Sequence, residues 1–171
     1  TGLLIMPEFE RKTLDMLKVN QVSMGKLYFG KLLCSFIIIL PVQLILFLIF
    51  IIATKVDGIT LDLSLQTYFK WLFLAVLASF PIITLQSYVT VKTRNFSKSV
   101  GLATIGSMFN FVLIFINEDL TKFFPYSQPM IALRSRSLAD MSLNDMIIFL
   151  AVNIFYSFVF YKFTVGALEK R

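Results

Sequence analysis

The sequence predicts an all-α, polytopic membrane helix bundle, and three observations carry this prediction. The stretch from Phe36 to Ile52 has no charged residue and is apolar at almost every position. The whole chain is 57% hydrophobic and only 15% charged, with a mean hydropathy of +0.80. Its apolar runs are continuous rather than alternating, which excludes a transmembrane β-barrel. Within hydrocarbon such segments must be helical, because a helix satisfies its own backbone N–H and C=O groups.

Four segments are predicted to span the membrane, and together they form a single transmembrane domain over residues 1–171. They cover residues 28–54, 69–91, 100–116 and 146–165. The first exceeds the roughly 20 residues that a spanning helix needs. The third contains small residues such as Gly106 and Ser107, which let helices approach closely, so we expect it inside the bundle. Because the chain begins at Thr1 with only a short apolar run, we expect that N-terminal spans are missing from this sequence.

The basic residues predict the orientation of these spans. Eleven of the 16 lysines and arginines lie before or at the start of the first span, between the second and third, or at the end of or after the fourth. The positive-inside rule therefore predicts that both ends of the chain are cytoplasmic. The 117–145 segment would then be extracellular, and its aromatic residues favour the membrane interface. Within it, Ser142 to Asp145 is typical of a helix cap.

A short amphipathic helix is predicted before the first span, within residues 8–26. Pro7 sets a boundary, and two glutamates follow it, as is common at a helix N-terminus. At 100° per residue one face collects Phe9, Thr13, Met16, Leu17, Asn20 and Met24, with charged residues opposite. Periodicity alone leaves three interpretations: a helix lying on the membrane surface, an extension of the first span, or a docking element for a soluble partner.

This region resembles the cytoplasmic element of ABC type-2 exporter permeases. The resemblance rests on Glu8 to Leu17, on Val22-Ser23, and on Gly30-Lys31 at the start of the next span. Phe124 to Pro129 is similar to the Pro-aromatic segment before that family's last span. The sequence departs from the pattern at Asn20-Gln21, where the family often has a proline before Val-Ser.

The resemblance implies a coupling helix that fits a groove in a separate ATPase subunit. The residues implied in ATPase coupling are Glu8, Phe9, Glu10, Arg11, Thr13, Leu14, Met16, Leu17, Gly30 and Lys31. It further implies an exporter of a hydrophobic or amphipathic substrate in a bacterial plasma membrane, with a second permease copy or a paralogue. In size and in its richness in aliphatic residues and Phe, the chain most resembles the lantibiotic-immunity permeases of Gram-positive bacteria. The alternative is a non-transporting membrane anchor, immunity or assembly protein whose helix lies on lipid.

The residues argue against enzymatic chemistry in this chain. It has no histidine and no Gly-x-x-x-x-Gly-Lys-Ser/Thr phosphate loop, so ATP and Mg²⁺ would be bound by the partner subunit. No metal ligand set is predicted, and the net charge of +6 indicates topology rather than nucleic-acid binding. The polar residues within the spans are Gln43, Gln86, Asn110 and Asn153. They would either form interhelical hydrogen bonds or line a path for the substrate.

Overall fold

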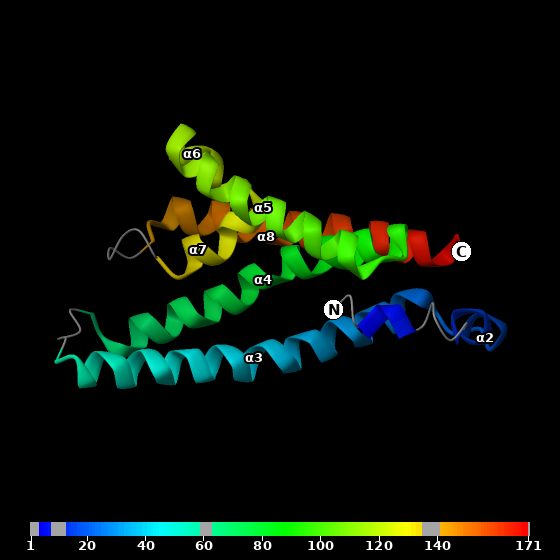
Figure 1. The fold of residues 1–171 in the computed structure, drawn as a ribbon, viewed down its shortest axis with the longest axis horizontal. Coiled ribbons are helices and arrows are strands. Elements are labelled where there is room, and N and C mark those ends of the chain that lie inside the picture. Colours follow the sequence, from blue (N-terminus) through cyan, green and yellow to red (C-terminus); the bar gives the residue numbers. More distant parts are fainter. Residues whose placement is uncertain (1–3, 8–12, 59–62, 135–140, 171) are drawn as a thin grey trace.

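The computed structural model describes residues 4–7, 13–58, 63–134 and 141–170, and all regular structure within these ranges is helical. The elements are α2 (Thr13–Val19), α3 (Met24–Val56), α4 (Leu65–Thr93), α5 (Phe96–Ile116), α6 (Glu118–Thr121), the 3-10 helix η1 (Pro125–Ser127), α7 (Gln128–Ala132) and α8 (Leu143–Glu169). Among them α3, α4, α5 and α8 are long and apolar enough to cross a membrane (Figure 1). The predicted all-α polytopic bundle is therefore confirmed.

Each of the four long helices begins before the apolar stretch that the sequence indicated, and in α4, α5 and α8 a polar side chain caps the first turn. Ser64 Oγ accepts a hydrogen bond from the Thr67 amide at 3.4 Å, and Asn95 Oδ1 accepts one from the Lys98 amide at 3.2 Å. The predicted cap before α8 is also present, since Ser142 Oγ accepts from the amide of Asp145 at 3.1 Å. These caps satisfy backbone donors that have no partner within the helix.

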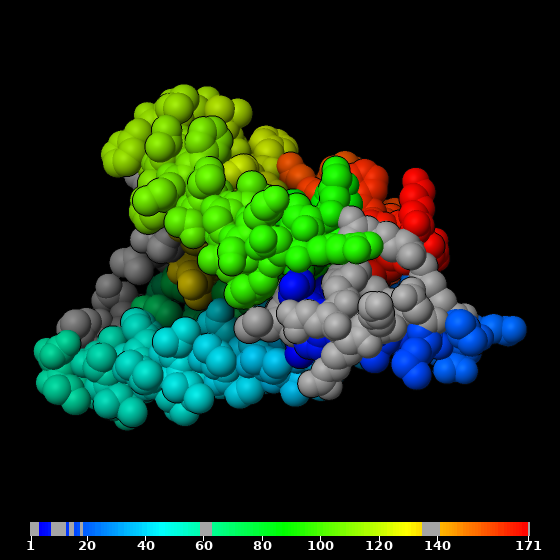
Figure 2. Space-filling view, turned by 45° about the vertical axis from the view of Figure 1, so that its right-hand side comes forward, coloured from blue at the N-terminus to red at the C-terminus, as the bar shows by residue number. Residues whose placement is uncertain are grey.

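The α4 helix is the centre of the bundle and has more buried residues than any other helix in the described part of the chain. It packs against α3, α5, α7 and α8. By contrast, α3 forms one long edge of the molecule (Figure 2). The prediction that the third span lies inside the bundle is wrong, because α5 buries only Ser99, Gly106, Asn110 and Leu113. Of the small residues that suggested burial, Gly106 is buried, whereas Ser107 is exposed.

Residues 118–132, from α6 to α7, form a folded-back segment that enters the bundle. The sequence indicated an interfacial location, whereas Ser127 and Gln128 are fully buried and η1 contacts α4, α5 and α8. Gly106 makes this entry possible. A Cβ atom added at Gly106 would lie 2.4–2.8 Å from atoms of the Tyr126 ring, so only glycine leaves room for that ring.

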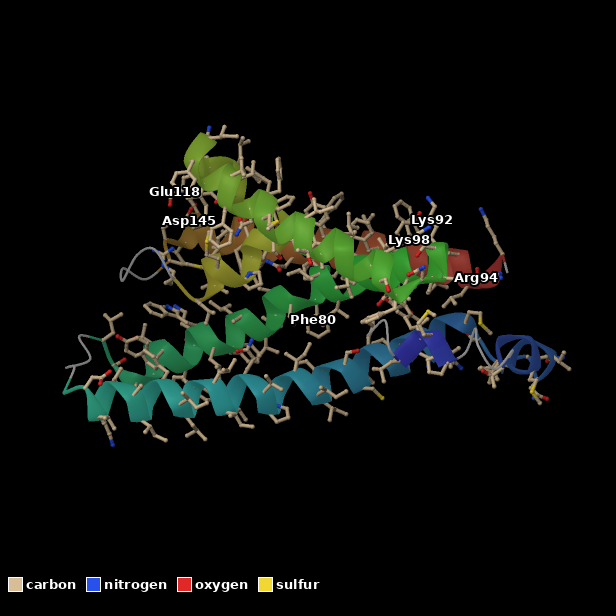
Figure 3. All side chains as sticks on the ribbon, in the orientation of Figure 1. Phe80, Lys92, Arg94, Lys98, Glu118 and Asp145 are labelled. Atoms are coloured by element: carbon tan, nitrogen blue, oxygen red, sulfur yellow. The ribbon has the colours of Figure 1, made fainter. Side chains whose placement is uncertain are left out.

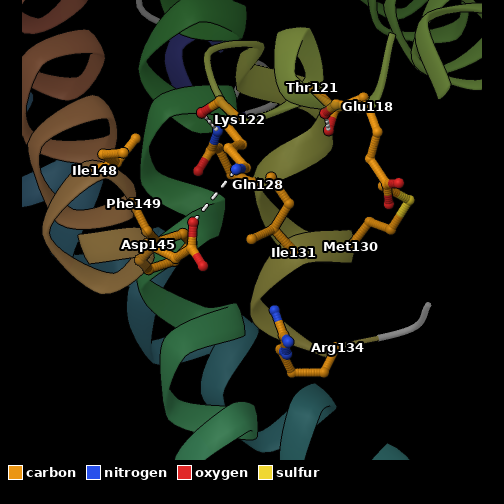
Figure 4. A pocket seen from close by; sticks show the side chains of 10 residues that line it. All are labelled: Glu118, Thr121, Lys122, Gln128, Met130, Ile131, Arg134, Asp145, Ile148 and Phe149. Carbon is orange, nitrogen blue, oxygen red and sulfur yellow. Dashed lines mark hydrogen bonds and ion pairs between the residues drawn. The ribbon is translucent and has the colours of Figure 1, made fainter. Parts of the chain in front are cut away.

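An exposed ion pair joins the folded-back segment to the start of α8. Lys122 Nζ lies 2.9 Å from Asp119 Oδ1 and 3.4 Å from Asp145 Oδ1, beside a small pocket of about 120 Å³ (Figure 4). The hydrogen bond to Asp119, and then the one to Asp145, hold the pKa of Lys122 above its ordinary value. Because these groups are largely solvated, each pair contributes about 1 kcal/mol at most.

The amphipathic helix ends earlier than the sequence indicated. α2 stops at Val19, so Asn20 and Met24, which the periodicity placed on its face, lie beyond it. The stop is a left-handed cap: Gln21 has a φ of +54°, and the Val22 amide donates to the Leu17 carbonyl at 3.0 Å. Proline cannot adopt a positive φ. The conformation of Gln21 therefore excludes the proline that the family pattern often has just before Val-Ser.

We expect Gly106→Ala to destabilise the protein by about 1–3 kcal/mol, because the added methyl group collides with Tyr126. The measurement is the thermal unfolding midpoint of the full chain in detergent. Gly101→Ala is the matched control on the same helix, since nothing lies within 4 Å of a Cβ added there. Equal midpoints for the two variants would contradict the close contact.

We expect Gln21→Gly to strengthen α2 by about 1 kcal/mol, because glycine adopts a positive φ without steric cost. Gln21→Pro should unfold the end of α2, because the ring fixes φ near −65°. Amide hydrogen exchange of residues 16–22 measures both effects locally. Identical exchange protection in the two variants would show that the left-handed cap is absent.

Candidate functional site at the basic end of the bundle

The charged residues divide the bundle into a basic end and an acidic end. The C-terminus of α8 and the turn between α4 and α5, with Lys92, Arg94 and Lys98, lie at the end that carries α2 (Figure 3). Glu118 and Asp145 lie at the opposite end. We call the end that carries α2 the basic end and the opposite end the acidic end. The candidate site for partner coupling is at the basic end, where α2 meets the spans.

A cluster of apolar side chains ties α2 to the spans, and we call it the junction cluster. It contains Ile5, Leu17, Met24, Tyr28, Leu32, Val91 and Leu168. Tyr28 is completely enclosed, and Ile5 is only 2% exposed. The members come from residues 4–7, α2, α3, α4 and α8, so three spans and α2 share one apolar contact. Burial of this area is favourable and non-directional, which suits a permanent attachment.

Polar and aromatic contacts fix the geometry of this junction. The Tyr161 hydroxyl donates to the Gly25 carbonyl at 3.1 Å, and the rings of Tyr28 and Tyr161 are 5.3 Å apart. Lys31 Nζ donates to the Leu4 carbonyl at 2.6 Å. The start of α3 is thereby held against α8 and against the chain before α2. Gly30, the neighbour of Lys31, is half-buried and has open space where a side chain would be.

The apolar side chains of α2 divide between two directions. Leu17 packs against the junction cluster, whereas Met16 is 65% exposed and Val19 is 83% exposed. Thr13 is half-buried. Glu8, Phe9, Glu10 and Arg11 lie outside the described residues, and Leu14 is described only as part of the helix. The exposed pair Met16 and Val19 is the surface that a partner could contact.

Three of the four predicted path residues lie around the folded-back segment. Gln86 Nε2 donates to the Tyr126 hydroxyl at 2.6 Å. Asn153 Nδ2 donates to Gln128 Oε1 at 2.9 Å, and the Ser127 hydroxyl donates to Asn110 Oδ1. Gln43 is half-buried on α3 and is not brought to this network. The structure thus supports the interhelical hydrogen-bond interpretation for Gln86, Asn110 and Asn153.

Sequence reasoning missed the partners of those residues and the far side of the junction. Tyr126, Ser127 and Gln128 lie in the segment that was placed at the interface. Tyr161 and Leu168 lie at the end of the last span, 148 and 155 positions after Thr13, the first residue of α2, and no local pattern marks them. The one available signal was the apolar run before Pro7, which contains the buried Ile5.

A groove opens between α3, α4 and α8, with a volume of about 570 Å³. Its walls are apolar, and its polar members are Thr84, Asn153 and Ser157. Asn153 Oδ1 is buried and has no hydrogen-bond partner in the described part of the chain. The groove therefore has the shape and the apolar lining to hold an elongated apolar group.

No set of three or more metal-ligating side chains lies together among the described residues. Comparison with known proteins identifies the family instead. Residues 1–110 match the family model described as ABC-2 family transporter protein. No curated protein and no solved structure matches the chain. Because the family model covers more than half of the sequence, the chain belongs to the ABC-2 family of transporter membrane proteins.

Proposed function

We propose that this chain is the permease subunit of an ATP-driven exporter and that α2 couples it to a separate ATPase. The observation that carries the proposal is the division of α2 between Leu17, which packs into the junction cluster, and the exposed Met16 and Val19. One side of the helix packs on a cluster to which three spans contribute, and the other side is available to a partner. A groove-bound amphipathic helix of this kind is a common mode of recognition.

Movement of α2 would reach the whole bundle through the junction cluster. α3 has 33 residues and continues through Pro41, so it is a rod of about 50 Å. Its first turns share the junction with the last turns of α4 and α8. A displacement of α2 by an ATPase would therefore tilt these helices together. Well-packed interiors transmit such strain rather than absorb it.

The basic end would face the cytoplasm, on the side of the ATPase. The support is the positive-inside rule, because lysines and arginines gather at the ends of α3, α4 and α8 that carry α2. The family resemblance makes a bacterial plasma membrane the proposed location. It also makes two permease copies, or a pair of paralogues, the proposed assembly with two ATPases.

The proposed substrate is hydrophobic or amphipathic. The groove between α3, α4 and α8 supports this class, because its walls are apolar. The resemblance to lantibiotic-immunity permeases suggests a peptide antibiotic, with drugs and lipids as the related possibilities. Outward transport is part of the proposal and rests on the same resemblance.

One competing function has a specific observation in its favour. The exposed Met16 and Val19 would also suit a helix that lies on lipid, as in a non-transporting anchor or immunity protein. The two functions differ in one measurable respect. A coupling helix needs Met16 and Val19 for association with the ATPase, whereas a lipid-bound helix does not.

We expect Met16→Asp combined with Val19→Asp to weaken co-purification of the co-expressed ATPase by at least about 30-fold, since central apolar contacts are commonly worth about 2 kcal/mol or more. Leu143→Asp is the matched control, because Leu143 is 84% exposed at the acidic end. Leu17→Asp is unsuitable, because it would damage the junction cluster itself. Undiminished ATPase binding with loss of membrane-surface contact would favour the non-transporting protein.

We expect Ser157→Trp to abolish transport while leaving ATPase association intact, because the indole ring fills the groove. Efflux of a fluorescent amphipathic peptide from energised cells measures the first effect, and co-purification measures the second. Ala151→Trp is the control on the same helix, since Ala151 is exposed and does not line the groove. Normal efflux by Ser157→Trp would exclude this groove from the substrate path.

A further inference from the structure

A second groove lies at the basic end, between the last turns of α4 and α8, and no step of the coupling proposal uses it. Its volume is about 420 Å³, and its lining includes Tyr88, Lys92, Lys162, Phe163 and Lys170. Among the residues that the structure describes, three lysines and no acidic residue line it. Such a local excess of positive charge favours an anionic occupant.

We propose that this groove binds the headgroup of an anionic phospholipid of the cytoplasmic leaflet, with the lysines on the phosphate and the aromatic rings beside the acyl chains. Basic pockets between spanning helices at this level are suited to such headgroups. The occupant would carry a phosphodiester without a compensating ammonium group. The inference stands apart from ATPase coupling and holds for either function considered above.

The depth of the lysines favours lipid over a soluble partner. Lys162 precedes Lys170 by eight residues, which places its Cα about 12 Å further along α8, toward the apolar part of the helix. Phe163, on the next position, also lines the groove and is 53% exposed. A groove that runs from charged helix ends to an exposed aromatic ring matches the change from headgroup to acyl chain.

Two of the lysines rest against aromatic rings in the structure. Lys92 Nζ lies 5.5 Å from the centroid of the Tyr88 ring, and Lys162 Nζ lies 5.6 Å from that of Phe158. A cation–π contact at an exposed site is weaker than a charge-assisted hydrogen bond to phosphate. A phosphate would therefore compete favourably with the rings for both ammonium groups.

Small residues at the base of the groove leave its volume open. Gly166 and Ala167 lie between the lysines, and no atom lies within 4 Å of a Cβ added at Gly166. A larger side chain at Gly166 would fill the groove without a collision with the rest of the protein. Gly166→Leu also favours the helix, because leucine has a much higher helix propensity than glycine.

The test measures how much phosphatidylglycerol the detergent-purified full chain retains, relative to phosphatidylcholine, by native mass spectrometry after mixing with both lipids. Changing Lys92, Lys162 and Lys170 to glutamine should lower retention roughly fivefold for each lysine. Gly166→Leu should lower it comparably while all three charges remain. The matched control changes Lys26, Arg94 and Lys98, which lie at the same end outside the groove, and should retain phosphatidylglycerol.

Four outcomes would overturn the proposal. The first is unchanged retention in both groove variants. The second is an equal loss in the control variant, which would indicate unspecific attraction by the basic end. The third is complete displacement of the lipid by millimolar inorganic phosphate, which would indicate a site for free phosphate. The fourth is loss of ATPase co-purification with unchanged lipid, which would assign the groove to a protein partner.

Discussion

The packing of Leu17 against the junction cluster around the buried Tyr28 is the contact on which the rest of the architecture depends. α2 has only seven residues, too few to be a stable helix in isolation. Packing of Leu17 against the junction cluster gives it a fixed place, and the left-handed cap at Gln21 sets its direction. The same contact leaves Met16 and Val19 outside. Without the junction, α2 would be a tethered surface helix with no mechanical relation to the bundle.

A second constraint acts inside the bundle, where polar groups need partners because lipid supplies none. The folded-back segment meets this constraint with side chains rather than with a long helix. Gln128 Nε2 donates to the carbonyl of Lys122 at 2.8 Å, and Gln128 Oε1 accepts from Asn153. The segment, α4, α5 and α8 are therefore held as one unit at the acidic half. The junction performs the corresponding task at the basic end, with apolar contacts in place of hydrogen bonds.

The sequence could predict features that depend on neighbouring residues. Four spans follow from local hydropathy, and the cap of Ser142 on Asp145 follows from residues three apart. The inward position of the folded-back segment depends on pairs such as Gln86 and Tyr126, 40 positions apart, which no local pattern indicates. Gly106 is one small residue among several on α5, and only its contact with Tyr126 distinguishes it. On α2, periodicity identified an apolar face but could not tell that Leu17 packs inward while Met16 is exposed. The cluster that Leu17 packs against includes residues distant in sequence, such as Val91 and Leu168.

The most direct test of the account is the accessibility of position 19. Cys34 is the only cysteine, so Cys34→Ser with Val19→Cys gives a chain with one thiol at the exposed side of α2. A membrane-impermeant maleimide should label this thiol in inverted vesicles and not in right-side-out vesicles. Assembly with the ATPase should suppress the labelling. Labelling in right-side-out vesicles, or labelling whose extent does not change when the ATPase is bound, would contradict the coupling role of α2.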